Sequence, residues 1–326
     1  MIYNSLSELS DDFDLFLFDA YGVFWEGNGF YENSRETMQN LIKQGKTVMV
    51  ISNSSALSVD NMKKYERQGL HYGKEYNFLI SSGDLLRKSL LEKSLKFSSC
   101  PNPKKYYVIG QPHIKAFADT DYEEVKTLDE ADFVYCGVPF IFEEQYNTYP
   151  ELRDKFLPFK TAESDKPVVW NSLTAEPFRD IVNEVIKSKL PAVNANPDYV
   201  AKEGHPLVHE LPAQFVVRNG TIAEMLRQAG AEVVEFGKPH KNIYEYAFEI
   251  LQNNGIKINK ARTCMIGDTV RTDIKGAVNV GIAPILCVET GVTAEEISRG
   301  NSLENICHKE NIALEEIIQI KSVGGK

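Results

Sequence analysis

The feature that most constrains the fold is the alternation of short apolar runs with helical patterns at both ends of the chain. Near the N-terminus, the strand-like runs DLFLFDA and KTVMVISNSS alternate with the helical segments SRETMQNLIKQG and SVDNMKKYERQG. The same order returns from EVVEFGKP through NIYEYAFEILQNNG, TCMIGDT and DIKGAVNVG to APILCVETG. Such alternation is typical of a parallel sheet covered by helices. It predicts an α/β fold in which the two ends form one doubly wound, Rossmann-like core.

A long stretch separates these two halves and contains apolar strands of its own, including YYVIG, DFVYCGV and PVVWNSL. The chain has 326 residues, which exceeds the usual size of one compact domain. We therefore expect an inserted α/β cap domain over residues 84–233 and a catalytic core built from residues 1–83 and 234–326.

The charge and the apolar pattern restrict the partners. The formal net charge of −10 argues against nucleic acid or an anionic membrane as the main partner, because both need a basic face. No apolar run approaches the roughly 20 residues of a membrane helix, and MIYNSLSELSDDFD lacks the features of a signal peptide. The five cysteines show no C-x-x-C pairing and indicate reduced thiols. The cytoplasm is the expected location.

Polar residues follow the two predicted strands near the N-terminus. Ligands of open α/β sheets bind beyond the carboxyl ends of the strands, so these positions are candidates for a site. Asp19 ends the first strand, although an acid there is also an ordinary turn residue. Ser52 and Asn53 follow the second strand, where a hydroxyl and backbone N–H groups can seat an anion.

The C-terminal half offers a lysine and a pair of acids in comparable places. Lys238 follows the run EVVEF, and Pro239 is expected to start the next helix. Asp268 comes directly after an apolar strand, and Asp273 lies five residues further on. Two such acids are typical of a hard-cation site, since magnesium prefers oxygen ligands. These positions together provide the parts that phosphoryl transfer needs. They are a nucleophile at Asp19, a hydroxyl at Ser52, a cation at Lys238 and a metal-binding pair at Asp268 and Asp273.

In these motifs the sequence resembles the haloacid dehalogenase superfamily, in the class IIA branch that carries a large C2-type cap. The segments FDAYGVFWEGNGFYENS, VISNSSA, FGKPHKNIYEYA and IGDTVRTDIKGAVNVGI are similar to its four motifs in order. That branch includes sugar-phosphate, nitrophenyl-phosphate and pyridoxal-phosphate phosphatases. The resemblance implies a magnesium-dependent hydrolase that acts on a small, sugar-phosphate-like metabolite, and self-association as a homodimer.

The resemblance also implies a role for each motif residue. Asp19 would attack phosphorus and become an aspartyl-phosphate. Ser52 and the backbone N–H of Asn53 would hold a phosphoryl oxygen, and Lys238 would balance charge. Magnesium would bind the carboxylates of Asp19 and Asp268.

Two further groups would complete the metal site. The backbone carbonyl of Tyr21 would be the third protein ligand, and Asp273 would support the metal waters or Lys238.

Tyr21 departs from the family pattern, because phosphatases of the superfamily usually have a second Asp there as general acid and base. That help is typically worth about 10²–10⁴-fold, and a tyrosine with a pKa of about 10 is a poor base at neutral pH. Three outcomes stay open: a slow phosphatase that uses Tyr21 or solvent, a different chemistry, or an impaired protein that binds a phosphometabolite. An oxidoreductase on a similar sheet would need a G-x-G-x-x-G turn, which the first strand lacks.

The cap is expected to close over the site, exclude water and contact the leaving group. In relatives the loop after the N-x-D segment reaches the site, and the matching stretch here is NPDYVAKEGH. It nominates the following substrate contacts: Asn196, Asp198, Tyr199, Lys202 and His205. Asn-Pro-Asp is also a good turn sequence, so each residue has an ordinary structural alternative.

Overall fold

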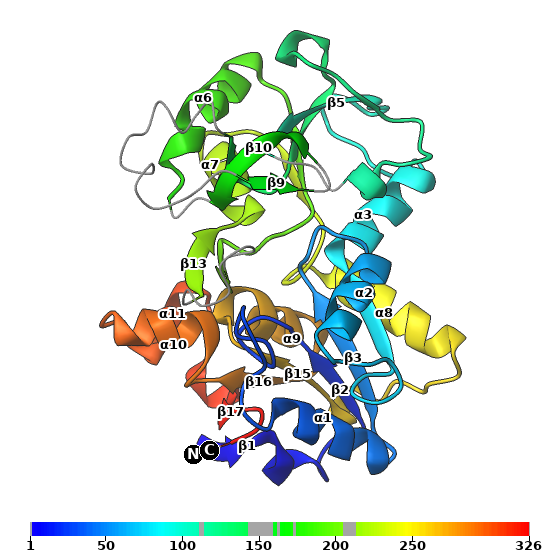
Figure 1. Cartoon of the computed structure of the whole chain (residues 1–326), viewed down its shortest axis with the longest axis vertical. Coiled ribbons are helices and arrows are strands. Elements are labelled where there is room, and N and C mark those ends of the chain that lie inside the picture. The colour runs from blue at the N-terminus through cyan, green and yellow to red at the C-terminus, as the bar shows by residue number, and fades with distance from the viewer. Residues whose placement is uncertain are drawn as a thin grey trace.

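The computed structural model describes residues 2–110, 114–142, 159–161, 164–171, 174–204 and 213–325. Figure 1 shows two parts stacked along the long axis of the molecule, with both termini at the base of the lower part. Within the described residues, every helix is too short or too polar to span a membrane.

The lower part is built on a seven-stranded sheet in which all neighbouring strands are parallel. In spatial order its strands are β1 (Ile2–Ser5), β17 (Ile318–Ser322), β16 (Ala283–Cys287), β15 (Thr263–Gly267), β2 (Leu15–Phe18), β3 (Thr47–Ser52) and β4 (Phe78–Ser81). The first and last strands of the chain pair with each other at one edge. The predicted doubly wound parallel sheet is therefore confirmed.

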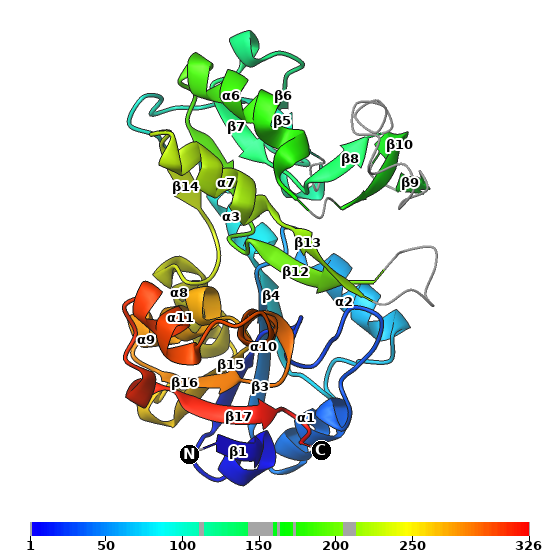
Figure 2. The ribbon, with the colours of Figure 1, turned by 90° about the vertical axis from the view of Figure 1, so that its left-hand side faces the viewer.

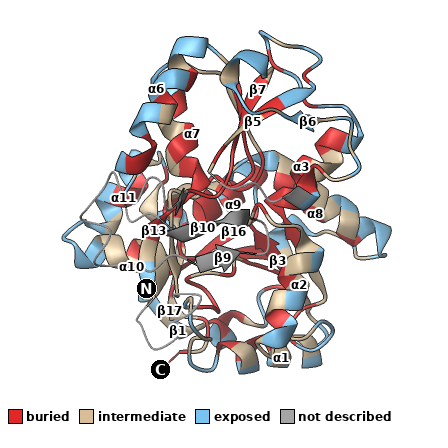
Figure 3. Cartoon of the chain, turned by 45° about the horizontal axis from the view of Figure 1, so that its top comes forward, coloured by how far each residue is buried: buried red, intermediate tan, exposed pale blue. Residues whose placement is uncertain are grey.

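Side chains of the strands alternate between the two faces of this sheet, as the pleat requires. Leu15 and Leu17 pack with one set of helices, namely α3 (Ser82–Leu91), α8 (Lys241–Asn253) and α9 (Lys275–Val280). Phe16 and Phe18 pack on the opposite face, against α1 (Ser34–Lys43), α2 (Ser58–Arg67) and the 3₁₀ turn Leu6–Leu9. Figure 3 shows these strands buried between their helices. The helices α10 (Gly291–Ser298) and α11 (Leu303–Lys309) complete the lower part.

The upper part, the cap, contains a second parallel sheet. Its strands in spatial order are β14 (Val233–Glu235), β11 (Ala192–Asn194), β7 (Phe133–Cys136), β5 (Lys105–Ile109) and β6 (Glu123–Glu124). One face packs against α6 (Arg179–Ser188) and α7 (Asn219–Gln228). The other face shares a hydrophobic cluster with the helices of the lower sheet. Cap and core are thus joined by continuous apolar packing.

Two small antiparallel sheets complete the cap (Figure 2). One consists of β8 (Phe140–Phe142), β10 (Ser164–Asn171) and β9 (Phe159–Thr161), and the other of β12 (Val200–Glu203) and β13 (Gln214–Val217). Figure 2 shows β12 and β13 between the cap sheet and the lower part. They carry the cap toward the carboxyl ends of the core strands.

The segment EVVEF corrects one expectation about the core. We expected it to open the second half of the core, but β14 pairs with β11 in the cap sheet. The following helix, α8, begins at Lys241 and not at Pro239. The domain limits at residues 84 and 233 stay predictions, with α3 and β14 crossing them.

The order of the core strands defines where a site can form. Chain order runs outward from β2 to β4 on one side and from β15 to β17 on the other, so it reverses between β2 and β15. Such a switch point leaves a crevice beyond the carboxyl ends of the two strands. Asp19 directly follows β2 and Asp268 directly follows β15, so the topology brings these two acids together.

Candidate active site

Asp19 lies at the switch point with its side chain 13% exposed. Its backbone N–H donates to the carbonyl of Ile266 in β15 at 2.9 Å, which fixes the residue between the two central strands. Burial raises the pKa of Asp19 to about 7, the Lys238 ammonium opposes this rise, and the carboxylates of Asp273 and Asp198 add to it. The carboxylate is therefore held in a tight, charge-rich environment.

Lys238 is 1% exposed and forms an ion pair with the Asp19 carboxylate. Its Nζ lies 2.7 Å from Oδ1 of Asp273. Burial alone would lower the pKa of this lysine, but the surrounding carboxylates outweigh burial and raise it. The Lys238 backbone is fixed by Asn53, whose Oδ1 accepts from the Lys238 N–H at 2.7 Å and whose Nδ2 donates to the Lys238 carbonyl at 3.1 Å. Lys238 thus stays charged beside Asp19.

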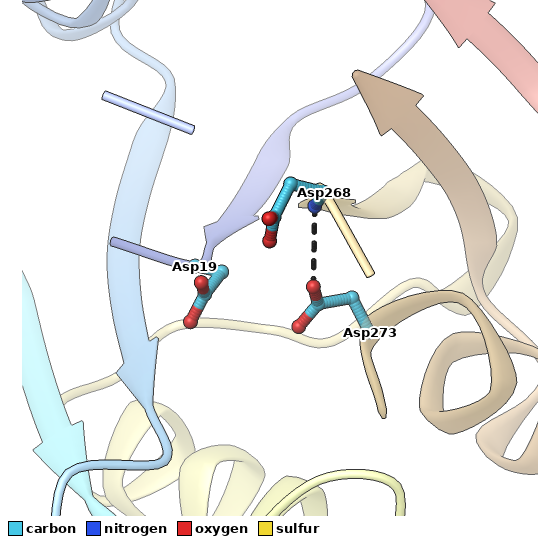
Figure 4. A group of neighbouring side chains, drawn as sticks. All are labelled: Asp19, Asp268 and Asp273. Atoms are coloured by element: carbon cyan, nitrogen blue, oxygen red, sulfur yellow. Dashed lines mark hydrogen bonds between the residues drawn. The ribbon is translucent and has the colours of Figure 1, made fainter. Parts of the chain in front are cut away.

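Three carboxylates gather beside this lysine. Asp19, Asp268 and Asp273 each place a carboxylate oxygen within 4.8 Å of the others (Figure 4). Oδ2 of Asp273 accepts the backbone N–H of Asp268 at 3.2 Å. Oδ2 of Asp268 accepts the N–H of Val292 at 2.6 Å. Burial, with the charges of Asp273 and Asp19, raises the pKa of Asp268 well above its ordinary value.

Close packing around Asp268 requires glycine at Gly22. This residue has a φ of +78°, and a Cβ there would lie 2.2 Å from Oδ2 of Asp268. A side chain would therefore push the carboxylate out of the cluster. The short FDAYG turn after β2 brings the main chain directly against Asp268 for this reason.

The donor set fits a divalent cation such as magnesium. Three buried carboxylates face a single ammonium, so the cluster carries excess negative charge that a cation would neutralise. All the side-chain donors are oxygens, which is the ligand type that magnesium prefers. Asp19, Asp268 and Asp273 are the residues that could hold it.

Ser52 and Asn53 lie at the end of the adjacent strand, β3. Ser52 is 5% exposed, lines the same cavity as Asp19, and accepts the N–H of Ser54 on its Oγ at 3.2 Å. The Asn53 side chain reaches into the cap, where its Nδ2 donates to Oδ1 of Asp198 at 2.8 Å. Asn53 therefore links the lysine segment and the cap, a role that its place after the strand did not reveal.

A cavity of about 670 Å³ opens from Asp19 between core and cap. Residues of both parts line it: Tyr21, Ser52, the segment 54–57 and one face of α2 from the core, and Lys115, Val138, Asn196, Asp198, Ala201, Glu203 and Arg218 from the cap. A cavity of this size is in the range of small-molecule sites. Of the candidate reacting groups, Asp19, Tyr21 and Ser52 thus border a binding space shared by core and cap.

Tyr21 lines this cavity beside Asp19. Lys64 of α2 donates from Nζ to the Tyr21 hydroxyl at 2.5 Å. Burial opposes ionisation of Tyr21, but the charges of Lys64 and Arg218 outweigh it and hold the pKa of Tyr21 below its ordinary value of 10. The position that usually carries the second Asp therefore has a tyrosine held by a lysine.

The residues nominated from the cap loop fall into two groups. Asn196 and Asp198 line the large cavity, and Oδ1 of Asn196 accepts the Asp198 N–H at 3.1 Å. Lys202 lines only a neighbouring cavity of about 20 Å³ and forms an ion pair with Glu26 at 2.7 Å.

Of the two remaining cap residues, Tyr199 lines neither of these cavities. Tyr199 packs under the guanidinium of Arg271, which lies 3.4 Å from the ring centre, so its role is a cap-to-core contact. His205 lies outside the described residues.

Sequence reasoning missed several cavity residues, among them Lys64 and Arg218, and the contact residue Arg271. Helical spacing places Lys64 on the same face of α2 as Asp60, but it does not indicate the contact with Tyr21. Arg218 follows β13, and the sequence around it contains no motif that indicates a site. Arg271 lies inside the GDTVRTD motif and donates to the carbonyl of Pro197 in the cap loop.

Two family models match the chain. A haloacid dehalogenase-like hydrolase model matches residues 16–121, and a HAD-hydrolase-like model matches residues 235–307. The first segment contains Asp19 and Ser52, and the second contains Lys238 and both acids of the fourth motif.

Curated relatives match about nine tenths of the chain. Phosphoglycolate phosphatase 1A of Arabidopsis thaliana is 28% identical over 302 residues, which span 91% of this chain and 74% of that protein. The 4-nitrophenylphosphatase of Schizosaccharomyces pombe is 23% identical over 315 residues, spanning 89% and 88%.

A solved structure agrees in fold. A haloacid dehalogenase-like hydrolase from Brucella suis 1330 covers 98% of this chain and 98% of its own, with a TM-score of 0.70 at 22% identity. The family models and the phosphatase relatives show that this chain belongs to the haloacid dehalogenase superfamily and is a hydrolase of its phosphatase class.

Proposed function

We propose that this phosphatase is magnesium-dependent, acts on a small phosphorylated metabolite, and works through an aspartyl-phosphate on Asp19. The observation that carries the proposal is the position of Asp19, which lines the cavity between core and cap, is paired with buried Lys238 and lies beside Asp268 and Asp273. A nucleophile, a fixed cation and a metal-binding acid pair in contact are the requirements of this reaction.

The reaction has two displacements. A carboxylate oxygen of Asp19 forms a bond to phosphorus while the bond from phosphorus to the leaving-group oxygen breaks. A water molecule then forms a bond to phosphorus while the bond from phosphorus to the Asp19 oxygen breaks, which releases inorganic phosphate and restores the Asp19 carboxylate. One proton of this water stays with the phosphate, and the other returns to the solvent the proton that the leaving-group oxygen took from it. Lys238 balances negative charge on the transferred group, and the Ser52 hydroxyl donates a hydrogen bond to one of its oxygens.

Magnesium would be held by the carboxylates of Asp19 and Asp268 and the backbone carbonyl of Tyr21, with Asp273 supporting the site through Lys238. When bound, the ion supplies positive charge beside the transferred phosphoryl group. The three neighbouring carboxylates and their excess negative charge support this assignment.

Tyr21 would serve the leaving group through a hydrogen bond. Lys64 donates to the Tyr21 oxygen, so it occupies an acceptor site and leaves the single O–H proton able to point elsewhere. Because Tyr21 lines the cavity, its O–H can donate to a leaving-group oxygen. This arrangement favours turnover without the usual second Asp.

The relatives suggest the first substrates to test. Their names specify phosphoglycolate and 4-nitrophenyl phosphate. Sugar phosphates belong in the same panel because the motif resemblance predicts them. The cytoplasmic location, the homodimer and the lack of nucleic-acid and membrane partners stay predictions.

The test is phosphate release by the full chain with magnesium or with EDTA. The variant Asp19→Asn removes the nucleophile, and Asp12→Asn is a matched control at an exposed position. We expect release that needs magnesium, persists in Asp12→Asn and is lost in Asp19→Asn. Equal activity of Asp19→Asn and the wild type would refute the nucleophile, and full activity in EDTA would refute the metal.

A further inference from the structure

One wall of the large cavity is formed by a single face of α2. Asp60, Lys63, Lys64 and Arg67 of this helix all line the cavity. Their spacing of three or four residues places them along one side of a helix, as the helical period requires. Three of these four side chains are basic, so α2 presents a positive stripe to the binding space.

The cap adds further basic side chains to this lining. Lys115 lines the cavity, and its Nζ lies 2.6 Å from Oδ1 of Asp60, which joins the cap to α2. Arg218 also lines the cavity, is 7% exposed and pairs with Glu203. The basic residues therefore come from both halves of the molecule.

The charges on the lining do not balance away from the reacting end. The lining as a whole has five basic side chains and four acidic ones, and two of the four acids, Asp19 and Asp198, lie at the phosphoryl end. This positive excess occurs in a chain whose formal net charge is −10. A cavity lined by one sign of charge attracts ligands of the other sign.

The phosphoryl group does not account for this excess. Lys238 already pairs with Asp19 and Asp273 at the reacting end, and the acid cluster there is the candidate metal site. Lys63 and Arg67 are exposed and have no carboxylate partner among the described residues. Both side chains line the cavity that the leaving group would share with the phosphoryl group.

We propose that the leaving group of the substrate carries a second anionic group, a carboxylate or a phosphate, which binds to the basic stripe of Lys63, Lys64 and Arg67 together with Lys115. This inference rests on the proposed function and deepens it, since it names the class of substrate. Phosphomonoesters with a neutral leaving group would fill the cavity without contacting its charges.

The first test compares pairs of similar phosphomonoesters, of which one member carries a second anionic group on the leaving group and the other does not. Phosphoglycolate is paired with ethylene glycol monophosphate, and glucose bisphosphate with glucose phosphate, so the two arms distinguish a carboxylate from a phosphate. We expect kcat/KM to be at least about tenfold higher for the charged member of one pair, and this ratio to fall as salt is raised, because salt screens exposed charges. Ratios near one in both pairs would overturn the inference.

The second test removes two basic side chains that do not touch Tyr21. The double variant Lys63→Met with Arg67→Met is compared with Lys43→Met, an exposed position on α1 that does not line the cavity. We expect the charged-to-neutral ratio of kcat/KM to fall at least about fivefold in the double variant and to stay at the wild-type value in the control. An unchanged ratio in the double variant would contradict the assignment.

Failure of the proposed function is recognised separately. If no phosphomonoester is hydrolysed, calorimetric titration with phosphoglycolate and ethylene glycol monophosphate still measures the preference for the charged ligand. Tighter binding of phosphoglycolate, weakened in the double variant, would support the basic stripe without turnover. Equal affinities would overturn it.

Discussion

Because Asp19 is buried, we expect that replacing its carboxylate with a neutral group stabilises the metal-free protein. Burial raises the pKa of Asp19 from 3.8 to about 7, so the folded chain holds this proton over a range in which the unfolded chain has lost it. A state that binds more protons loses stability as pH rises. The free energy of unfolding therefore falls between about pH 4 and pH 7, and the penalty is complete above pH 7.

The size of the penalty follows from the shift. One pKa unit corresponds to about 1.4 kcal/mol, so a shift of about three units costs about 4 kcal/mol at pH 8 and, with Asp19 still largely protonated, about 2 kcal/mol at pH 5. Asparagine resembles the protonated acid in shape and cannot ionise. We expect Asp19→Asn to be more stable than the wild type by about these amounts in EDTA.

Urea unfolding in EDTA at the two pH values measures this difference, with Asp12→Asn as the exposed control. The variant should gain more at pH 8 than at pH 5, and the control should match the wild type at both. Magnesium at pH 8 should then stabilise the wild type more than Asp19→Asn, because the variant has lost a candidate ligand. A variant that is less stable than the wild type at pH 8 would refute the reasoning.

Three further changes test other parts of the site and fold. Tyr21→Asp should raise kcat for alkyl phosphates by about tenfold or more but change 4-nitrophenyl phosphate little, because nitrophenolate leaves without a proton; equal effects would contradict this. Gly22→Ala should raise the magnesium concentration for half-maximal activity by about tenfold, since its Cβ would meet Asp268, whereas Gly29→Ala has open space and should not. Glu75→Gln should cost about 1–3 kcal/mol in urea unfolding with kcat retained, because this buried carboxylate accepts hydrogen bonds from three residues; unchanged stability would contradict it.

The core half of the site could be anticipated from sequence because it depends on a simple rule. The last residues of parallel strands meet at one sheet edge, so Asp19 after β2 and Asp268 after β15 converge once both strands are recognised. Ser52 is the last residue of β3 and reaches the same edge. These positions require only the strand pattern and the direction of pairing.

The position of Lys238 does not follow from this rule, because the strand before it is not part of the core sheet. Its preceding strand, β14, pairs with Ala192–Asn194 in the cap, and nothing in EVVEF distinguishes that pairing from one in the core sheet. The lysine still reaches Asp19, because Asn53 binds its backbone from the core side. Long-range hydrogen bonds from Asn53 therefore hold Lys238 in the site. The sequence pattern places Lys238 there for another reason, namely that it follows a predicted strand.

The leaving-group half of the cavity depends on how the cap is seated on the core. Asp198 accepts a hydrogen bond from Asn53, Lys115 pairs with Asp60, and Arg271 packs on Tyr199, so contacts from two cap segments, residues 198–199 and Lys115, support that seating. The basic stripe of α2 becomes part of a cavity shared with the cap only when these contacts form. Selectivity for the leaving group should therefore respond to changes at the cap contacts, while the bond-forming groups around Asp19 stay anchored in the core sheet.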